Sequence, residues 1–189
     1  RLTATIAEQV ATLEAEIDAS MLNAAYVLQK ADEHGALTLA QMEALKKQTG
    51  MNDLYISDDR GVFIEPTTVR EAIGLSLLDI WEGYGMLLTG ESTYLPSSMK
   101  LKVETGEIFK FTAIPRANGN GIIQSALAVD SIETMLNTFF EQDYSLESLY
   151  LFDNANLVLT QNLASDVTPP FTKGQQVTNI EGIVTYTFK

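Results

Sequence analysis

The sequence predicts an α+β fold in which one long helix precedes two antiparallel sheet modules of unequal size. Three observations support this prediction: a helical stripe that opens the chain without interruption, an order of strands and helices unlike that of parallel sheets, and a hairpin pattern that occurs twice. The chain has 189 residues, 46% hydrophobic and 20% charged, so it can bury a core and we do not expect disorder.

Charge and residue usage exclude several classes of protein. The formal net charge is -13, with 25 acidic and 12 basic residues, which disfavours binding to nucleic acid or to anionic lipid because both need a basic face. The chain has no cysteine, so disulfides, zinc thiolate sites and thiol catalysis are excluded. No apolar run reaches the roughly 18 residues that would span a bilayer.

The first predicted element is an amphipathic helix over residues 2 to about 33. Its apolar side chains recur every three or four residues, at Leu2, Ile6, Val10, Leu13, Ile17, Met21, Ala24 and Leu28. Neither Gly nor Pro interrupts it before Gly35, and a helix of this length measures roughly 45–50 Å. We expect the stripe to contact a second copy of the chain, giving a homodimer through the N-terminal helix.

A short helix and a hairpin come next. The helix is predicted from Leu39 to Gln48, with Thr38 as its cap and Gly50 as its stop. Residues 53–64 place two apolar runs on either side of an Asp-Asp-Arg-Gly turn, which is typical of a β-hairpin.

The rest of the first sheet module contains two helices and two strands. Thr67 or Thr68 is expected to cap a helix that runs from Val69 to about Leu88. Two strands follow at Ile108–Pro115 and Gly121–Val129, joined by a turn at Arg116–Asn120. A final helix is predicted from Ile132 to about Glu141, with Ser131 as its cap.

The hairpin pattern repeats at a constant offset of 95 residues. Residues 148–159 match residues 53–64 without a gap, and the matched pairs include Tyr55 with Tyr150, Asp58 with Asp153, and Gly61 with Asn156. Chance similarity is the alternative, but the match indicates that the chain begins the same unit twice. The second unit is shorter: a loop at Val167–Phe171 leads to a closing hairpin over Gln176–Ile180 and Ile183–Phe188.

These elements predict three regions. Residues 1–50 hold the long helix and the second short helix, residues 51–143 form the first sheet module, and residues 144–189 form a small or truncated second module. Only the first module is large enough to enclose a ligand.

This layout resembles the double Cache sensor domains of bacterial methyl-accepting chemotaxis receptors and sensor histidine kinases. The resemblance rests on the element order, on the two Leu-Tyr hairpins at residues 53–64 and 148–159, and on a strand pair with Thr105-Gly106, Ala113-Ile114-Pro115, Asn118-Gly119 and the run Gly121 to Asp130. It implies a membrane-distal PAS-like module with flanking helices and a smaller membrane-proximal PAS-like module, both extracytoplasmic in a membrane-anchored protein.

The resemblance also implies a place for the ligand. It puts a small solute in the distal module, between the sheet and the loop after the middle helix, and Asp130 matches the family position whose carboxylate holds a ligand ammonium group. The chain departs from the amino-acid-binding members at Ser92–Lys100, where an Arg-x-Trp-Tyr-like motif is missing, which puts an amino-acid ligand in doubt.

Six further residues are candidates for the binding site. Trp81, Tyr84 and Tyr94 carry rings near the middle loop, and such rings often line small-ligand pockets, although a core position is the more frequent reading for Trp81. Lys110 and Arg116 can hold a carboxylate, with a solvent-facing Lys, a turn-edge Arg or an Arg116–Asp130 pair as alternatives. Tyr55, on a central strand, can reach the same pocket.

No catalytic or metal-binding set is evident. His34 is the only histidine and lies at a helix end beside Gly35, where a capping role is favoured over a ligand role. Asp53, Asp58 and Asp59 are typical of turns rather than of a metal site. We therefore expect no enzyme activity, no cofactor and no metal.

The predicted function is the ligand-sensing domain of a bacterial transmembrane chemoreceptor, with an organic acid, an amine or an amino acid as ligand. The alternatives are the sensor domain of a histidine kinase, or an extracytoplasmic binding or adhesion module that does not signal. A sensor is expected to carry transmembrane segments shortly before Arg1 and shortly after Lys189 in the full-length protein.

Overall fold

The computed structural model describes residues 2–97, 99–102, 105–142, 148–160, 162–163 and 171–178. A long N-terminal helix is followed by an antiparallel sheet with flanking helices, so the predicted α+β class is confirmed. The chain forms two compact units: the first comprises Arg1–Ile17, Ser98–Phe109 and Ala128–Lys189, and the second comprises Asp18–Ser97 and Lys110–Leu127. None of the described helices is both long and apolar enough to cross a membrane.

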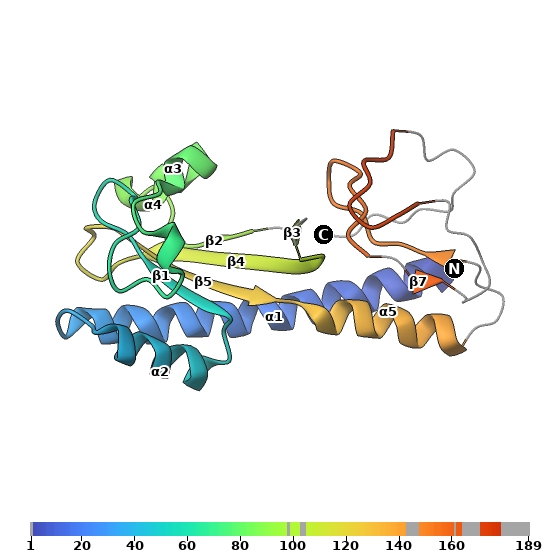
Figure 1. Cartoon of the computed structure of the whole chain (residues 1–189), viewed down its shortest axis with the longest axis horizontal. Helices are drawn as coiled ribbons and strands as arrows, with labels where there is room; N and C mark the ends of the chain where they lie inside the picture. Colours follow the sequence, from blue (N-terminus) through green and yellow to red (C-terminus); the bar gives the residue numbers. More distant parts are fainter. Residues whose placement is uncertain are drawn as a thin grey trace. The chain divides into compact units, whose positions relative to one another are not determined.

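The predicted leading helix is confirmed as α1, Leu2–Glu33 (Figure 1). Most of its apolar stripe from Ile6 to Leu28 is buried within the chain, with Val10, Met21 and Leu28 almost fully covered and Leu13 half-buried. These side chains are therefore not available for the dimer contact that we expected the stripe to make.

The second helix, α2, spans Leu39–Thr49 and has the ends that its sequence predicts. The Thr38 side chain accepts a hydrogen bond from the backbone N–H of Gln41, and the Gln41 side chain accepts one from the Thr38 backbone, which completes a capping box. Gly50 ends the helix with a φ of 73°, a left-handed conformation that favours glycine.

One antiparallel sheet contains five strands in the order β1-β5-β4-β2, with β3 also paired to β4. Their bounds are Asp53–Ile56 (β1), Leu95–Pro96 (β2), Lys100–Lys102 (β3), Glu107–Pro115 (β4) and Ile122–Ala128 (β5). The two long predicted strands and the turn between them are thus confirmed. The backbone N–H of Arg116 donates to the carbonyl of Gly121 at 2.9 Å and closes that turn.

In the second unit the two faces of the sheet have different neighbours. The C-terminal half of α1 and helix α2 lie on one side of the strands, and α3 (Leu77–Ile80) and α4 (Gly85–Thr89) lie on the other (Figure 1). We call the side toward α1 the helix face; there the Ser125 hydroxyl donates to the Met21 carbonyl at 3.0 Å. We call the opposite side the covered face; Ala113 and Ile122 pack there against Leu77.

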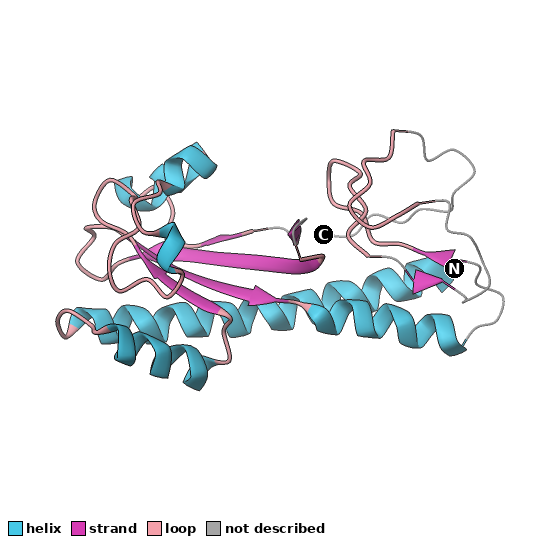
Figure 2. Ribbon diagram, viewed as in Figure 1, coloured by secondary structure: helices cyan, strands magenta, loops and turns pink. Residues whose placement is uncertain are grey.

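The predicted middle helix from Val69 to Leu88 is wrong. The structure has four short helical pieces instead, the 3-10 helices η1 (Arg70–Ala72) and η2 (Glu82–Tyr84) together with α3 and α4. Figure 2 shows that loops make up much of this region. We call residues 70–89 the cover segment.

Backbone pairing explains the break in that helix. The N–H of Phe63 donates to the carbonyl of Leu75 at 2.9 Å, and the N–H of Gly74 donates back to the carbonyl of Phe63 at 2.8 Å. A helix cannot form where these groups are engaged with the backbone of Phe63, and Gly74 has a φ of 92° that no helix contains. Ser76 then caps the shorter helix α3.

The predicted repeat is confirmed in its hydrogen bonds. The Asp58 carboxylate accepts from the backbone N–H groups of Arg60 and Val62 at 2.9 and 3.0 Å. At the offset of 95, the Asp153 carboxylate accepts from those of Ala155 and Leu157 at 2.8 and 2.9 Å. The turn glycine and its counterpart both have positive φ, 81° for Gly61 and 61° for Asn156. Asp58 therefore forms a turn, as expected, and Asp153 repeats it, whereas Asp53 lies in β1 rather than in a turn.

The repeat extends beyond the residues that the sequence comparison matched. Gly174 donates to the carbonyl of Val158 at 2.9 Å, and Val158 donates to Gln175 at 3.0 Å, which reproduces the pairing of Phe63 with Gly74 and Leu75. An insertion of five residues separates the two parts of the repeat, so a gapless comparison does not find it.

These hydrogen bonds also set the ionisation of Asp58. Burial acts to raise the pKa of its carboxyl group, but the N–H donors of Val62 and Arg60 and the Arg60 guanidinium outweigh burial and hold the pKa below its ordinary value. The charged form of Asp58 is therefore favoured by folding.

The first unit contains α5, Asp130–Gln142, and a two-stranded sheet of β6 (Ser148–Leu149) and β7 (Asn162–Leu163). Because α5 begins at Asp130, Ser131 lies inside the helix and the prediction that it caps the helix is wrong. The loop at Val167–Phe171 and the closing hairpin fall almost entirely outside the described residues, so the smaller module is described only in part.

Candidate solute-binding site

The covered face carries the apolar cluster that joins the sheet to the cover segment. Its buried members are Phe63, Ala72, Leu77, Tyr84, Leu87, Ala113 and Ile122. Tyr55, Val69, Leu78, Leu88 and Leu95 pack around them. The rings of Tyr55 and Phe63 lie 4.9 Å apart at a tilt of 38°. Strand residues, the turn after β1 and the cover segment thus share one core.

Two predicted site residues, Tyr55 and Tyr84, meet in this cluster. Burial, and to a lesser extent the charge of Asp53, raises the pKa of the Tyr55 phenol above its ordinary value. Burial alone raises the pKa of Tyr84. Both phenols stay protonated at neutral pH, so they can donate and accept hydrogen bonds but do not act as bases.

A third predicted residue, Trp81, lies at the edge of the same region. Its side chain is 49% exposed, so the core position that sequence reasoning favoured is wrong. Its ring meets Tyr84 edge to face at 5.4 Å. Gly83 makes room for it, because a Cβ there would lie 2.1 Å from the Trp81 ring.

Sequence reasoning missed a polar group on the covered face, the amide of Gln124. Gln124 pairs with Tyr55 across β5 and β1 and lies two residues from Ile122, so its side chain shares their face. It is only 4% exposed, and none of the described residues forms a hydrogen bond with its Oε1 atom. The signal in the sequence was a glutamine at an inward position of the buried strand Ile-Ile-Gln-Ser-Ala, which period-two alternation identifies.

The two basic candidates lie on the helix face and have acidic partners there. Lys110 is 1% exposed and its Nζ lies 3.0 Å from Asp18 Oδ1, so it is not the solvent-facing lysine of the alternative reading. Arg116 holds Asp32 with Nε to Oδ2 at 2.8 Å and Nη2 to Oδ1 at 3.0 Å. The pairing of Arg116 that we considered exists, but its partner is Asp32 rather than Asp130. Ligand roles for both stay predictions.

The remaining candidates, Tyr94 and Asp130, lie elsewhere. Burial, and then the nearby Asp18 and Tyr26, raises the pKa of Tyr94, which places its phenol toward α1. Asp130 is exposed at the start of α5 in the first unit, whereas the other six candidates belong to the second unit. Within the second unit, the structure brings Tyr55, Tyr84 and Trp81 together and leaves Lys110, Arg116 and Tyr94 apart from them.

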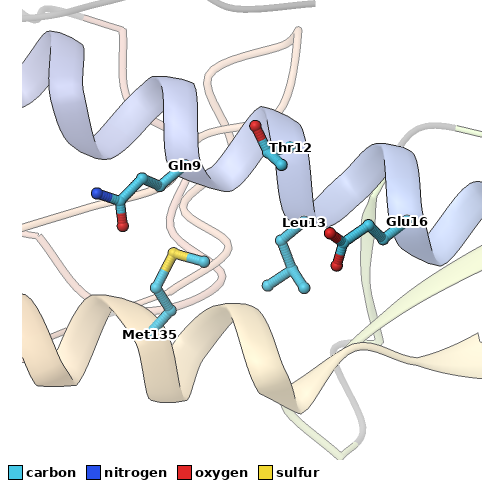
Figure 3. Close-up of a pocket in the computed structure, with 5 residues that line it drawn as sticks. All are labelled: Gln9, Thr12, Leu13, Glu16 and Met135. Carbon is cyan, nitrogen blue, oxygen red and sulfur yellow. The ribbon is translucent and has the colours of Figure 1, made fainter.

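Two cavities lie away from the covered face. One of about 230 Å³ is lined by Asp32, Glu33, Ala117 and Asn118. The other, of about 300 Å³, lies between α1 and α5 (Figure 3), where Leu13 and Met135 project toward each other from the two helices.

Metal binding has little support among the residues that the structure describes. No group of three acidic or histidine side chains gathers there to hold a metal ion. A ring nitrogen of His34 lies 2.8 Å from the Lys30 carbonyl at the end of α1, which confirms the helix-end role predicted for this histidine.

Comparison with solved structures identifies the fold. The extracellular ligand-binding receptor of Desulfohalobium retbaense matches with a TM-score of 0.56 and 14% identity, over 85% of this chain and 30% of that one. The sensory domain of the Campylobacter jejuni chemoreceptor Tlp3 matches with a TM-score of 0.56 and 9% identity, over 85% of this chain and 68% of that one.

A third solved structure agrees. The ligand-binding domain of the Pseudomonas aeruginosa amino-acid chemoreceptor PctC, in complex with GABA, matches with a TM-score of 0.51 and 13% identity, over 85% of this chain and 72% of that one. No family model matches the chain, and no curated protein matches it by sequence. The chain therefore has the fold of these sensory domains, as the resemblance to double Cache sensors implied.

Proposed function

We propose that the chain is the extracytoplasmic solute-sensing domain of a transmembrane receptor and that the solute binds on the covered face of the second unit. One observation carries this proposal: under a separate covering segment, the covered face holds the buried Tyr84, the half-buried Tyr55 and an amide oxygen of Gln124 that no described residue hydrogen-bonds. The shared fold supports it, since Tlp3 has been solved with isoleucine bound and PctC with GABA.

The construction of the cover segment suits entry of a solute. Its four helical pieces have three to five residues each, so their separation from the sheet breaks few helical hydrogen bonds. The strands beneath are joined to each other by backbone hydrogen bonds and do not depend on the cover. A solute that replaces part of the apolar contact between cover and sheet can bind without unfolding the sheet.

The chemistry of this face favours binding over catalysis. Proton transfer at neutral pH needs a group with a pKa near 7, and both phenols are shifted further from that value. A protonated phenol and an amide orient a ligand through hydrogen bonds. We propose a sensory role and no enzyme activity.

A route for the signal follows from the helix face. Three contacts join β4, the turn after it and β5 to α1: Lys110 with Asp18, Arg116 with Asp32, and Ser125 with Met21. A solute that displaces these strands on the covered face displaces α1 as well, provided it binds two states of the domain with different affinity. In a homodimer through α1 the contact would use the exposed side of the helix, where Tyr26 is 48% exposed.

A thermal-shift screen of amino acids, organic acids, purines and amines tests this function. A ligand at a hundred times its Kd stabilises the domain by about 2.7 kcal/mol, which is easily measured. If Asp130 holds an ammonium group, Asp130→Ala abolishes the shift given by an amine; an unchanged shift removes Asp130 from the site. In a full-length receptor, the output module would decide between chemoreceptor and kinase signalling.

A further inference from the structure

We propose that Gln124 determines what the site accepts, and that the solute is an amine or a primary amide that donates an N–H to the Gln124 carbonyl oxygen. This inference rests on the proposed function and adds the chemical class of the ligand and the residue that selects it. It is carried by the burial of Gln124, by its missing partner and by the placement of the basic side chains.

The Gln124 amide is in an unfavourable position in the ligand-free chain. A buried polar atom without a partner costs about 1–3 kcal/mol, and the described residues supply no hydrogen bond to Oε1. The neighbours on its own face are Ile122 and Tyr55, and the apolar cluster lies above them. An apolar side chain would fill this position better for stability alone, so an orphan acceptor here points to a donor that arrives with the ligand.

Charge excludes the opposite chemistry. A carboxylate ligand needs a cation, and Lys110 on β4 and Arg116 in the turn after β4 lie on the helix face with Asp18 and Asp32. Residues 57–97, which include the cover segment, contain only Arg60 and Arg70 as basic residues. Both are exposed and paired locally, Arg60 with Asp58 and Arg70 with Glu65. The covered face can therefore bind a ligand that donates an N–H and carries no carboxylate.

Two variants test the inference. Gln124→Met removes the amide and keeps the length of the side chain. Thr112→Val is the matched control: the Thr112 hydroxyl is also buried and has no partner within the described part of the chain, but it lies on the helix face, on the opposite side of β4 from Ala113. Each variant removes a buried oxygen that no described residue hydrogen-bonds, so we expect both to melt at or above the wild-type temperature, and only Gln124→Met to lose binding.

The probes are butylamine, butyramide and butyrate with their propyl and pentyl counterparts, in a thermal-shift assay beside the broad solute screen. We expect amines or amides to stabilise the wild type and Thr112→Val, and the affinity of Gln124→Met to fall about tenfold or more. An undiminished amine or amide shift in Gln124→Met overturns the role of Gln124. Stabilisation by carboxylates alone overturns the ligand class and leaves the proposed function standing. A wild-type domain that no solute of either set stabilises overturns both.

Discussion

Arg116→Met tests whether Arg116 holds the fold together or holds the ligand. The guanidinium makes two hydrogen bonds to Asp32, and the side chains are 19% and 6% exposed. Removal of one partner from a buried pair leaves a buried charge and costs about 3–5 kcal/mol. Because the cavity beside Asp32 gives water some access, we take the lower end, about 3 kcal/mol.

That loss is measurable by thermal or urea unfolding. For a chain of this length about 3 kcal/mol lowers the melting temperature by roughly 6–12 °C. The control is Lys46→Met, which breaks a pair with Glu43 whose side chains are 29% and 45% exposed, and we expect it to cost less than about 0.5 kcal/mol. The double variant Arg116→Met with Asp32→Leu should lose less than Arg116→Met alone, because no charge is left behind.

The two roles of Arg116 give opposite patterns. If Arg116 is structural, Arg116→Met melts well below Lys46→Met and still gains stability from solute. A melting temperature close to that of Lys46→Met, together with loss of the solute shift, would refute the structural assignment and return Arg116 to the ligand site.

Three further predictions concern stability. Because folding lowers the pKa of Asp58, the stability that its carboxylate contributes is present above the unfolded pKa of about 3.9 and is lost as the pH falls through the folded pKa. Asp58→Ala should therefore cost about 1–2 kcal/mol at neutral pH. In urea unfolding at several pH values, the variant should lose less stability on acidification than the wild type does. Gly121→Ala brings a Cβ within 2.3 Å of a backbone oxygen and should cost about 3 kcal/mol or more, against about 1–2 kcal/mol for Gly119→Ala, whose Cβ meets open space; equal costs would contradict the close approach. Leu77→Ala should cost about 2–5 kcal/mol and the half-exposed Trp81→Ala clearly less, despite the larger side chain, and a reversed order in thermal unfolding would place Trp81 in the core.

Elements governed by local rules were predictable from the sequence. The stripe of α1, the capping box at Thr38, the stop at Gly50 and the strands β4 and β5 follow from spacing and turn chemistry within a few residues. The repeat was predictable for the same reason, because Asp58 and Asp153 each organise a turn through their own neighbours.

Features set by distant partners were not predictable. The helical spacing from Val69 to Leu88 was real, but Phe63 engages the backbone of Leu75, and this pairing across the fold overrides local propensity. The core position predicted for Trp81 is wrong for the same reason. Trp81 comes four residues after Leu77 and would share its buried face only if both lay on one continuous helix.

The candidate site shows the same division. Period-two alternation along β4 separates Lys110 from Ala113, but the choice of Asp18 as the partner of Lys110, 92 residues away in sequence, depends on how α1 packs on the sheet. Alternation along β5 identifies Gln124 as an inward residue. That no described residue hydrogen-bonds its Oε1 atom cannot be read from the sequence, because it depends on all the side chains that surround it.

Amide hydrogen exchange with and without a stabilising solute tests the central claim most directly, since it locates the solute without substitution. The account predicts slower exchange in the cover segment, residues 70–89, and in β1 and β5 beneath it, with a smaller effect on the part of α1 in the second unit. Protection confined to α5 and β6, with the cover segment unchanged, would contradict binding on the covered face.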